Sequence, residues 1–313
     1  MRRRPTSGFT LIELVMVISI IALVAAAVVV FIRPATQAYI GTSYRADMSV
    51  QLDGALRRML RDVRRAVPNS IRAPAPECFE LVPTVAGGRY RTGPDRSTDA
   101  ATCFPQPTPP TAPSASCTAY VDPSQSTVAF DVLSRMSTTP VSDQDFVVIN
   151  NQNGNDVYST GANRSLIKGF SNHNAPLASD YMYGEHRMTI SALQVSPGYT
   201  SARFQVVSGT EQSVFYVCQK EQASQGNTLS SGDGNWTLYR MVRPFQSTYP
   251  SACPTVSSSN ATVVARRLTS CTFVYNPNQG ATQQSGYIWM SLQMSRNNEL
   301  AQLIAGGHVM NVP

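Results

Sequence analysis

The sequence is 313 residues long, enough for one or two domains with an apolar core. Hydrophobic residues make up 42% of it, and a large share of them lies between positions 9 and 32. The net charge of +6 comes largely from three arginines at positions 2–4 and from five more between positions 57 and 65. Because the charge is clustered locally, it gives little support to nucleic-acid binding, and no nucleic-acid partner is expected.

An apolar run of 24 residues extends from Phe9 to Ile32. As a helix it would be about 36 Å long, enough to cross a hydrocarbon core of about 30 Å. A secretory signal would be shorter and would have its cleavage site at the far end, whereas here the small residue Gly8 precedes the run. The arginines before the run outnumber Arg33 after it. The positive-inside rule therefore predicts a cytoplasmic N-terminus and places the bulk of the chain across the membrane.

Glu13 introduces a carboxylate into this run, which costs about 2.5–3.5 kcal/mol at the centre of a membrane helix. One interpretation is that Glu13, about one turn into the run, extends its side chain towards the lipid headgroups. The other is that it has a partner or a function within the membrane. The residues around Glu13 favour the second interpretation.

The segment Gly8-Phe9-Thr10-Leu11-Ile12-Glu13-Leu14 resembles the signature of type IV prepilins and pseudopilins, in which a short basic leader ends in glycine. The resemblance implies that prepilin peptidase cleaves after Gly8 and that the new N-terminal residue, Phe9, is N-methylated. It also implies an assembly role for Glu13, whose carboxylate would neutralise the free α-amino group of a neighbouring subunit. Paired buried charges of this kind select a register more than they add stability.

The resemblance also implies how the chain is organised. Residues 1–8 are predicted to be the leader peptide, 9–32 a transmembrane or filament-core helix, 33–67 an amphipathic stalk helix and 68–313 a periplasmic β-rich head. The protein would lie in the inner membrane with a single span and later in a pilus or pseudopilus. Its implied partners are prepilin peptidase, other minor and major pilins, the inner-membrane assembly platform and the lipid bilayer.

Beyond the span, apolar residues continue at helical spacing and predict a face that packs on the head: Met48, Leu52, Leu56, Met59, Leu60, Val63 and Val67. Pro34 predicts a kink or a locally melted turn, Gly41 a looser turn, and Pro68 the end of the helix. The arginine cluster occupies largely other faces: Arg57, Arg58, Arg61, Arg64 and Arg65. A solvated surface is the favoured interpretation of that cluster. A contact with an acidic neighbouring subunit, or with DNA or anionic lipid, is the alternative.

The rest of the chain alternates short apolar segments with Gly, Asn, Ser and Pro, which predicts a mostly antiparallel β head and therefore an α+β fold. The predicted strands cover residues 126–133, 145–150, 188–193, 202–207, 213–220, 237–242, 262–266, 271–275, 287–294 and 301–312. Within one of them, alternation turns Val214, Tyr216 and Cys218 to the same face. Residues 92–116 are rich in proline and predict an exposed loop.

All six cysteines follow the apolar run: Cys78, Cys103, Cys117, Cys218, Cys253 and Cys271. An even number of cysteines in an oxidising compartment favours disulfides. Cys103 and Cys117 would tether the proline-rich loop. Cys253 and Cys271 flank one predicted strand, which makes a local bridge between them plausible, although the sequence leaves the connectivity open.

No catalytic motif is recognisable, and we expect neither an enzyme nor a metal or cofactor site. The histidines are dispersed, at His173, His186 and His308. Asp143, Asp145 and Asp156 resemble calcium ligands only loosely, because they lack EF-hand spacing. Aromatic residues are expected to pack within the sheets rather than to line a carbohydrate or protein surface: Trp236, Trp289, Tyr181, Tyr183 and Tyr239.

The chain is thus predicted to be a structural subunit, a large minor pilin that takes part in priming or capping pilus assembly. Two alternatives stay open. A type II secretion pseudopilin would share every N-terminal feature. A pilus-borne adhesin or DNA-binding subunit would use the aromatic residues or the arginines, and DNA binding would weaken steeply with salt.

Overall fold

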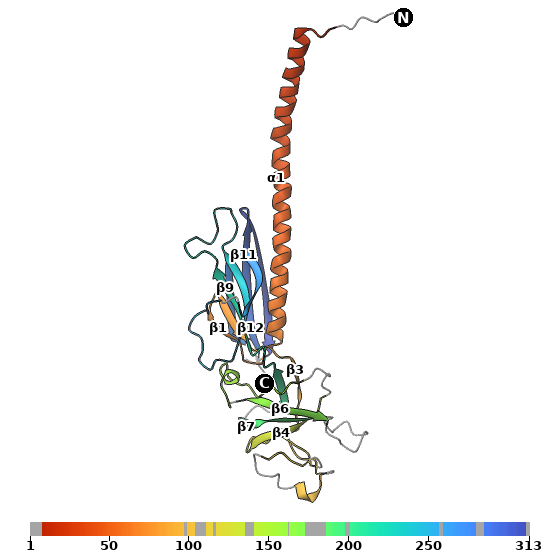
Figure 1. The fold of residues 1–313 in the computed structure, drawn as a ribbon, viewed down its shortest axis with the longest axis vertical. Coiled ribbons are helices and arrows are strands. Elements are labelled where there is room, and N and C mark those ends of the chain that lie inside the picture. Colours follow the sequence, from red (N-terminus) through yellow and green to blue (C-terminus); the bar gives the residue numbers. More distant parts are fainter. Residues whose placement is uncertain are drawn as a thin grey trace, which may run out of the picture.

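The structure is a computed structural model that describes residues 8–96, 99–103, 111–114, 117–134, 141–161, 163–172, 186–197, 201–256, 259–279 and 285–310. One long helix, α1 (Leu11–Arg64), projects from a head that contains two antiparallel sheets (Figure 1). Two 3-10 turns, η1 (Ala101–Cys103) and η2 (Asp156–Tyr158), are also present. This is the pilin-like α+β fold that the sequence predicts.

The helix α1 is slightly shorter than the predicted helix over residues 9–67. It ends one turn before Pro68, because the chain joins the sheet region there, with the Val67 N–H donating to the carbonyl of Val82 at 2.8 Å. Pro34 lies inside α1 without interrupting it, so the locally melted turn does not form. The Thr36 hydroxyl donates to the carbonyl of Ile32 at 3.1 Å, a hydrogen bond that spans the turn containing Pro34.

The predicted apolar stripe packs on the head. Its helical members are each at most 3% exposed, apart from the half-buried Leu60: Met48, Leu52, Leu56, Met59 and Val63. They share a cluster with Phe79, Tyr216 and Phe273 from the sheet. Burying a side chain of this size contributes about 1.5–3 kcal/mol, so this stripe holds the helix on the head.

The larger sheet, here called the proximal sheet, has seven strands in the order β1-β2-β9-β10-β11-β12-β13 and lies beside α1. Its strands are β1 (Arg72–Ala75), β2 (Cys78–Leu81), β9 (Ser213–Lys220), β10 (Trp236–Arg243), β11 (Ala261–Gln279), β12 (Ser285–Arg296) and β13 (Glu299–Met310). Val214, Tyr216 and Cys218 all belong to the cluster that α1 covers, as the alternation in their strand predicts.

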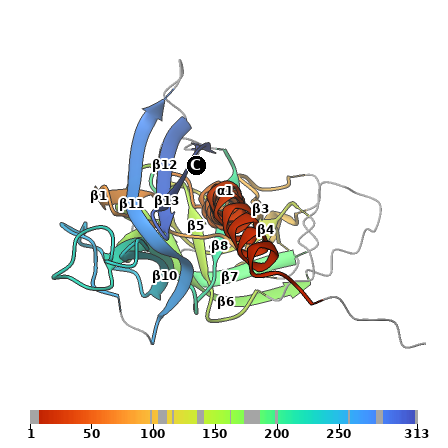
Figure 2. The same cartoon turned by 90° about the horizontal axis from the view of Figure 1, so that it is seen from above.

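The helix α1 lies beside the last strand, β13 (Figure 2), and the two run in the same direction, because Gly41 lies near Glu299 and Leu60 near Gly307. Near the start of this contact, a Cβ on Gly41 would lie 2.7 Å from a carboxylate oxygen of Glu299. Near its end, a Cβ on Gly307 would lie 2.7 Å from Leu60. The ion pair between Arg45 and Glu299, at 2.9 Å, joins helix and strand. Gly41 therefore permits a close approach of the strand and does not mark a looser turn.

The smaller sheet, here called the distal sheet, lies beyond the end of α1 (Figure 1) and has the order β3-β8-β5-β6-β7-β4. Its strands are β3 (Ala86–Arg89), β4 (Ser126–Val132), β5 (Phe146–Ile149), β6 (Arg164–Asn172), β7 (His186–Gln194) and β8 (Arg203–Val207). It has its own core, in which Phe130 and Phe204 pack with their ring centroids 5.5 Å apart. The head thus has two lobes.

Four strands were not predicted from the sequence patterns: β1, β2, β3 and β6. These strands are short, contain Pro or Gly, or lack clean alternation. Conversely, the predicted strands 262–266 and 271–275 are a single strand, β11, with a bulge between them where Arg267 has a φ of 59°. Of the predicted strand 301–312, residues 311 and 312 lie outside the described residues.

A buried charge cluster joins the two lobes. The guanidinium of Arg72, in β1, is fully buried and lies 3.6 Å from the equally buried carboxylate of Glu80. It donates to the carbonyls of Gly154 at 3.4 Å and Gln246 at 3.0 Å, and its carbon lies 3.3 Å from the ring centroid of Tyr158. Since Gly154 and Tyr158 belong to the distal lobe, Arg72 links that lobe to the proximal sheet.

Candidate functional site

The start of α1 carries the residues that the sequence singles out. Thr10 is the N-cap, with extended backbone angles, and its hydroxyl accepts a hydrogen bond from the Glu13 N–H at 3.4 Å. Thr10 and Glu13 therefore occupy the two positions of a capping box, although only this half of the box is formed. A carboxylate in the first turn is also favoured by the positive end of the helix dipole.

Gly8, Phe9 and Glu13 are all exposed, and Phe9 is 83% exposed. Within the described residues, Glu13 makes no ion pair. The structure thus presents Glu13 on the surface of the helix, close to Phe9 in sequence. Residues 1–7 of the predicted leader lie outside the described residues.

The first half of α1 projects away from the described part of the head (Figure 1). Every described residue from 8 to 40 is exposed, including large apolar side chains such as Leu11 (81%) and Ile12 (70%). The helix is long and apolar enough to cross a membrane. An apolar surface of this size needs lipid or protein around it, because leaving it in water is unfavourable.

The second half of α1 carries the arginine cluster on its exposed side. Arg57 pairs with Asp53 at 2.7 Å, one turn earlier. Arg58, Arg61, Arg64 and Arg65 are exposed. Of these, Arg61 and Arg64 lie in the last turn, where cations stabilise the negative end of the helix dipole.

The six cysteines form three disulfides: Cys78–Cys253, Cys103–Cys117 and Cys218–Cys271. The predicted bridge between Cys253 and Cys271 is therefore wrong. Cys271 faces the core under α1 and bonds to Cys218 across the intervening strand β10, whereas Cys253 belongs to a cluster with Cys78 on another part of the sheet. Spacing along the chain could not reveal these faces.

The other candidate residues are not brought together. His186 stacks on Phe170 with ring centroids 4.8 Å apart, and His308 contacts Tyr287. The Asp145 carboxylate accepts hydrogen bonds from backbone N–H groups of its own loop and of Gly209. Among the described residues, no three His, Cys, Asp or Glu side chains group as metal ligands would. His173, Tyr181 and Tyr183 lie outside the described residues.

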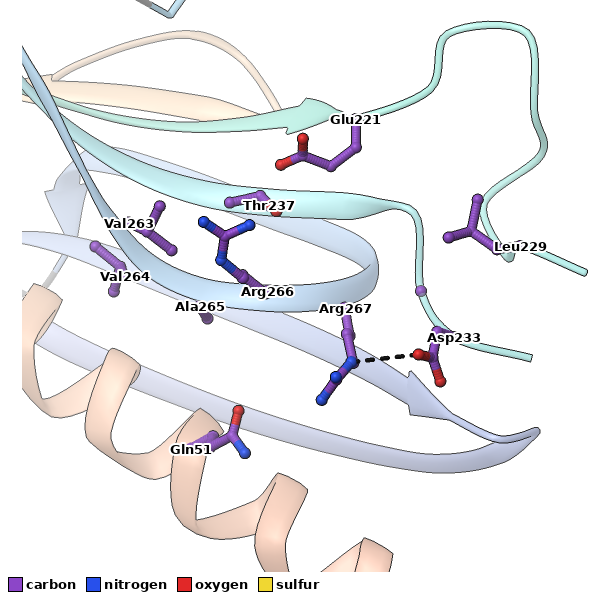
Figure 3. A pocket seen from close by; sticks show the side chains of 11 residues that line it. Gln51, Glu221, Leu229, Asp233, Thr237, Val263, Val264, Ala265, Arg266 and Arg267 are labelled. Atoms are coloured by element: carbon purple, nitrogen blue, oxygen red, sulfur yellow. Dashed lines mark ion pairs between the residues drawn. The ribbon is translucent and has the colours of Figure 1, made fainter. Parts of the chain in front are cut away.

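A hollow of about 500 Å³ lies between α1 and the bulge in β11 (Figure 3). Arg267 pairs with Asp233 at 3.3 Å there, and Figure 3 shows this pair with Gln51 of α1 below it. Hydrogen bonds from Thr237 and Tyr239 lower the pKa of Glu221, and the nearby charge of Arg266 adds to this shift. Each arginine in this hollow thus faces an acidic residue, so the hollow has no excess charge.

Comparison with known protein families identifies one motif in the sequence. Residues 3–29 match the family model of the prokaryotic N-terminal methylation motif. No curated protein and no solved structure matches the chain. The chain therefore carries the N-terminal methylation motif of type IV prepilins and pseudopilins, on a pilin-like fold, and its exposed apolar helix is consistent with a membrane-anchored pilin. Pilins are typically structural, non-enzymatic subunits.

Two features of functional interest were missed at the level of sequence. The capping role of Thr10 has a readable signal, the spacing of Thr and Glu at positions 10 and 13. The buried pair of Arg72 and Glu80 has none, because the two residues meet only through the register of β1 and β2, and Arg72 contacts Tyr158 only when the two lobes meet.

Proposed function

We propose that this chain is synthesised with a leader, residues 1–8, which prepilin peptidase removes after Gly8, and that Phe9 is then N-methylated. The observation that carries this proposal is the methylation motif at the start of a helix whose first half is fully exposed. The first half of this helix has no partner among the residues that the structure describes. It is suited first to a membrane and then to the packed helices of a filament.

In this proposal, Glu13 pairs with the α-amino group of Phe9 on a neighbouring subunit. After cleavage, that amino group is a cation at the end of an apolar helix, and burying it unpaired would be costly. Glu13 is exposed and makes no ion pair within the described residues, so its carboxylate is available. A carboxylate four residues along a neighbouring, axially shifted helix would fix the offset between subunits.

We further propose that the chain is a minor pilin that primes or caps assembly of a type IV pilus of the mannose-sensitive haemagglutinin kind, similar to the O component of that pathway. Its large head suits a subunit present in few copies. Its partners would be prepilin peptidase, other minor and major pilins and the inner-membrane assembly platform, with the head in the periplasm. A type II secretion pseudopilin is the alternative, because it would carry the same motif, and an adhesin or DNA-binding subunit is a second.

The proposal is tested first by the intact mass and N-terminal sequence of the full chain, extracted from membranes with and without prepilin peptidase. The expected product begins at N-methylated Phe9 and appears only when the peptidase is present. An uncleaved chain, or cleavage at the far end of the apolar run, would contradict the proposal and indicate an ordinary anchor or secretory signal.

Glu13→Ala should leave cleavage and membrane insertion unchanged and should impair filament assembly, because the partner of the carboxylate lies on another subunit. Assembly is measured by quantifying sheared filaments and by cross-linking between subunits. Ser19→Ala is the matched control, since the Ser19 hydroxyl donates only to the Val15 carbonyl of its own helix, at 2.8 Å. Normal assembly of the Glu13 variant would refute the pairing.

A further inference from the structure

A second hollow, of about 380 Å³, lies in the distal sheet where the edge strand β3 pairs with β8. Gly87 and Gly88 line it. A Cβ on Gly87 would lie 3.0 Å from the Phe204 carbonyl oxygen, and one on Gly88 would lie 3.0 Å from the Phe204 ring. The tight packing favours glycine at both positions. Gly87 shares its face of β3 with Arg89, so its missing side chain leaves that face open, whereas Gly88 points to the Phe204 ring.

Arg89 and Arg203 lie side by side in the lining of this hollow. They are direct partners in the β3–β8 register, so their side chains project from the same face of the sheet, and both are exposed. Like charges directly opposite one another on antiparallel strands are destabilising. Within the described residues, neither guanidinium forms an ion pair, whereas Arg45 and Arg240 do. The two charges thus meet without a compensating acid.

Two polar groups complete the lining. The Ser134 hydroxyl accepts a hydrogen bond from the Arg89 backbone N–H at 2.7 Å, but it lies on the Gly88 face of β3, 3.1 Å from where a Cβ on Gly88 would be, and the arginine side chains project from the other face. Gln205, opposite Gly87 in the register, has a buried side-chain oxygen without a hydrogen-bond partner. Neither group is therefore an accessible ligand beside the arginines, and the hollow offers two cations.

We propose that Arg89 and Arg203 bind a phosphate group in this hollow. Two guanidinium groups, each with several N–H donors, match the several acceptor oxygens of a phosphate, and an anion between the arginines replaces their repulsion with attraction. This site is independent of the assembly role of Glu13.

Phosphate in the headgroups of the anchoring membrane is out of reach of this site. The hollow lies beyond the end of α1, because the Thr84 hydroxyl in its lining donates to the carbonyl of Arg65 at 2.7 Å. The helix from Arg33 to Arg64 separates it from the predicted span by about 48 Å. The phosphate must therefore be free in solution or carried by a soluble or envelope-bound polyol.

The Leu133 N–H donates to the Arg89 carbonyl at 2.8 Å, so the β3 edge is paired there and, within the described residues, only its part at residues 86–88 stays open. A competing explanation is that the arginines only protect this open part from pairing with another chain, a common role for charged residues on edge strands. That role needs the charges but no bound anion. Calorimetric titration of the full chain in detergent micelles, at constant ionic strength, separates the two explanations. Inorganic phosphate and glycerol 3-phosphate are the probes, and chloride is the reference anion.

The wild-type chain is expected to bind phosphate saturably, and Arg203→Gln to weaken binding about tenfold or more, as the loss of a charge-assisted hydrogen bond requires. Without phosphate, Arg203→Gln should melt no lower than wild type, because a repulsion is removed. Arg266→Gln is the matched control: this arginine is equally exposed but faces Glu221, and its loss should leave phosphate binding unchanged.

Tighter binding of glycerol 3-phosphate would identify a polyol phosphate as the ligand, and equal or weaker binding would identify the free ion. Both results support the site. No saturable binding of either probe, or undiminished binding by Arg203→Gln, would overturn it. In that case, increased self-association of Arg203→Gln would establish edge protection as the role of the two arginines.

Discussion

Arg72 and Glu80 form a fully buried ion pair at the joint between the lobes. Burial lowers the pKa of Arg72 and raises the pKa of Glu80, with the charge of Arg243 opposing the shift at Glu80. One nitrogen of Arg72 and one oxygen of Glu80 have no hydrogen-bond partner. The net contribution of such a pair to stability is small. Removing one partner leaves the other charge buried and unpaired, which costs about 3–5 kcal/mol.

The raised pKa of Glu80 makes stability depend on pH. Between the ordinary glutamate pKa and the raised folded value, the folded state binds more protons than the unfolded state, so the free energy of unfolding falls as pH rises through that window. Glu80→Gln should remove this pH dependence of the free energy of unfolding. It should also lower stability at neutral pH, because it leaves the buried charge of Arg72 without its carboxylate partner. Chemical denaturation of the full chain in detergent at a series of pH values measures both effects.

The control for this experiment is Glu211→Gln, which removes a partly exposed carboxylate that pairs with Arg240 at 2.5 Å. Its effect at neutral pH should be smaller, because partly exposed ion pairs contribute little. A Glu80 variant as stable as wild type at neutral pH would show that Arg72 does not depend on its carboxylate.

At the scale of elements, the stalk half of α1 is held to the proximal sheet by its apolar stripe. Leu52 is fully buried in the middle of that stripe. Leu52→Ala should lower the free energy of unfolding by about 2–5 kcal/mol, the cost of a lost buried side chain plus the cavity it leaves. Denaturant unfolding in detergent, followed by tryptophan fluorescence, measures the loss.

Val50 provides the matched control, since it is on the same helix but 73% exposed. Val50→Ala should change stability by no more than about 0.5 kcal/mol. If the Leu52 and Val50 variants lost equal stability, the stripe would not be what joins helix and head.

The helix and the head were predictable to different degrees. The span of α1 and its stripe follow from local composition and a 3.6-residue period, which depend on neighbouring residues alone. Neither local composition nor periodicity predicts strands β1 and β3, because β1 contains Pro74 and β3 contains Gly87 and Gly88. These two strands form by pairing with the edges of β2 and β8. The same limit applies to Arg89 and Arg203, which meet only through strand register.

At the scale of the whole molecule, the disulfides are divided between the two lobes. Cys103–Cys117 closes the proline-rich loop near the distal sheet, whereas Cys78–Cys253 and Cys218–Cys271 brace the proximal sheet. Arg187, in β7, ties that loop to the distal sheet by donating to the carbonyl of Cys117 at 2.6 Å. The loop therefore has a covalent and a hydrogen-bonded anchor.

Replacing both Cys103 and Cys117 with Ala should loosen the distal lobe alone. Closing a loop of this length stabilises by about 3 kcal/mol in the chain-entropy account. Hydrogen exchange of the full chain should therefore speed up at residues 117–132 and stay unchanged in β12 and β13. The paired Cys218→Ala and Cys271→Ala variant should show the reverse pattern. Faster exchange in both lobes of either variant would mean that the lobes unfold as one unit.

The side-by-side course of α1 and β13 determines how the subunit bears mechanical load. From Gly41 to Leu60 the helix advances about 29 Å, and from Glu299 to Gly307 the strand advances about 26 Å, so the two remain in step along the contact. A pull on the start of α1, resisted by the head, acts along this contact in shear. Under such shear, all the side-chain contacts between α1 and β13 must break at the same time rather than one after another. The force passes from β13 to β12 through a ladder that spans the full strand, which spreads tension across the proximal sheet.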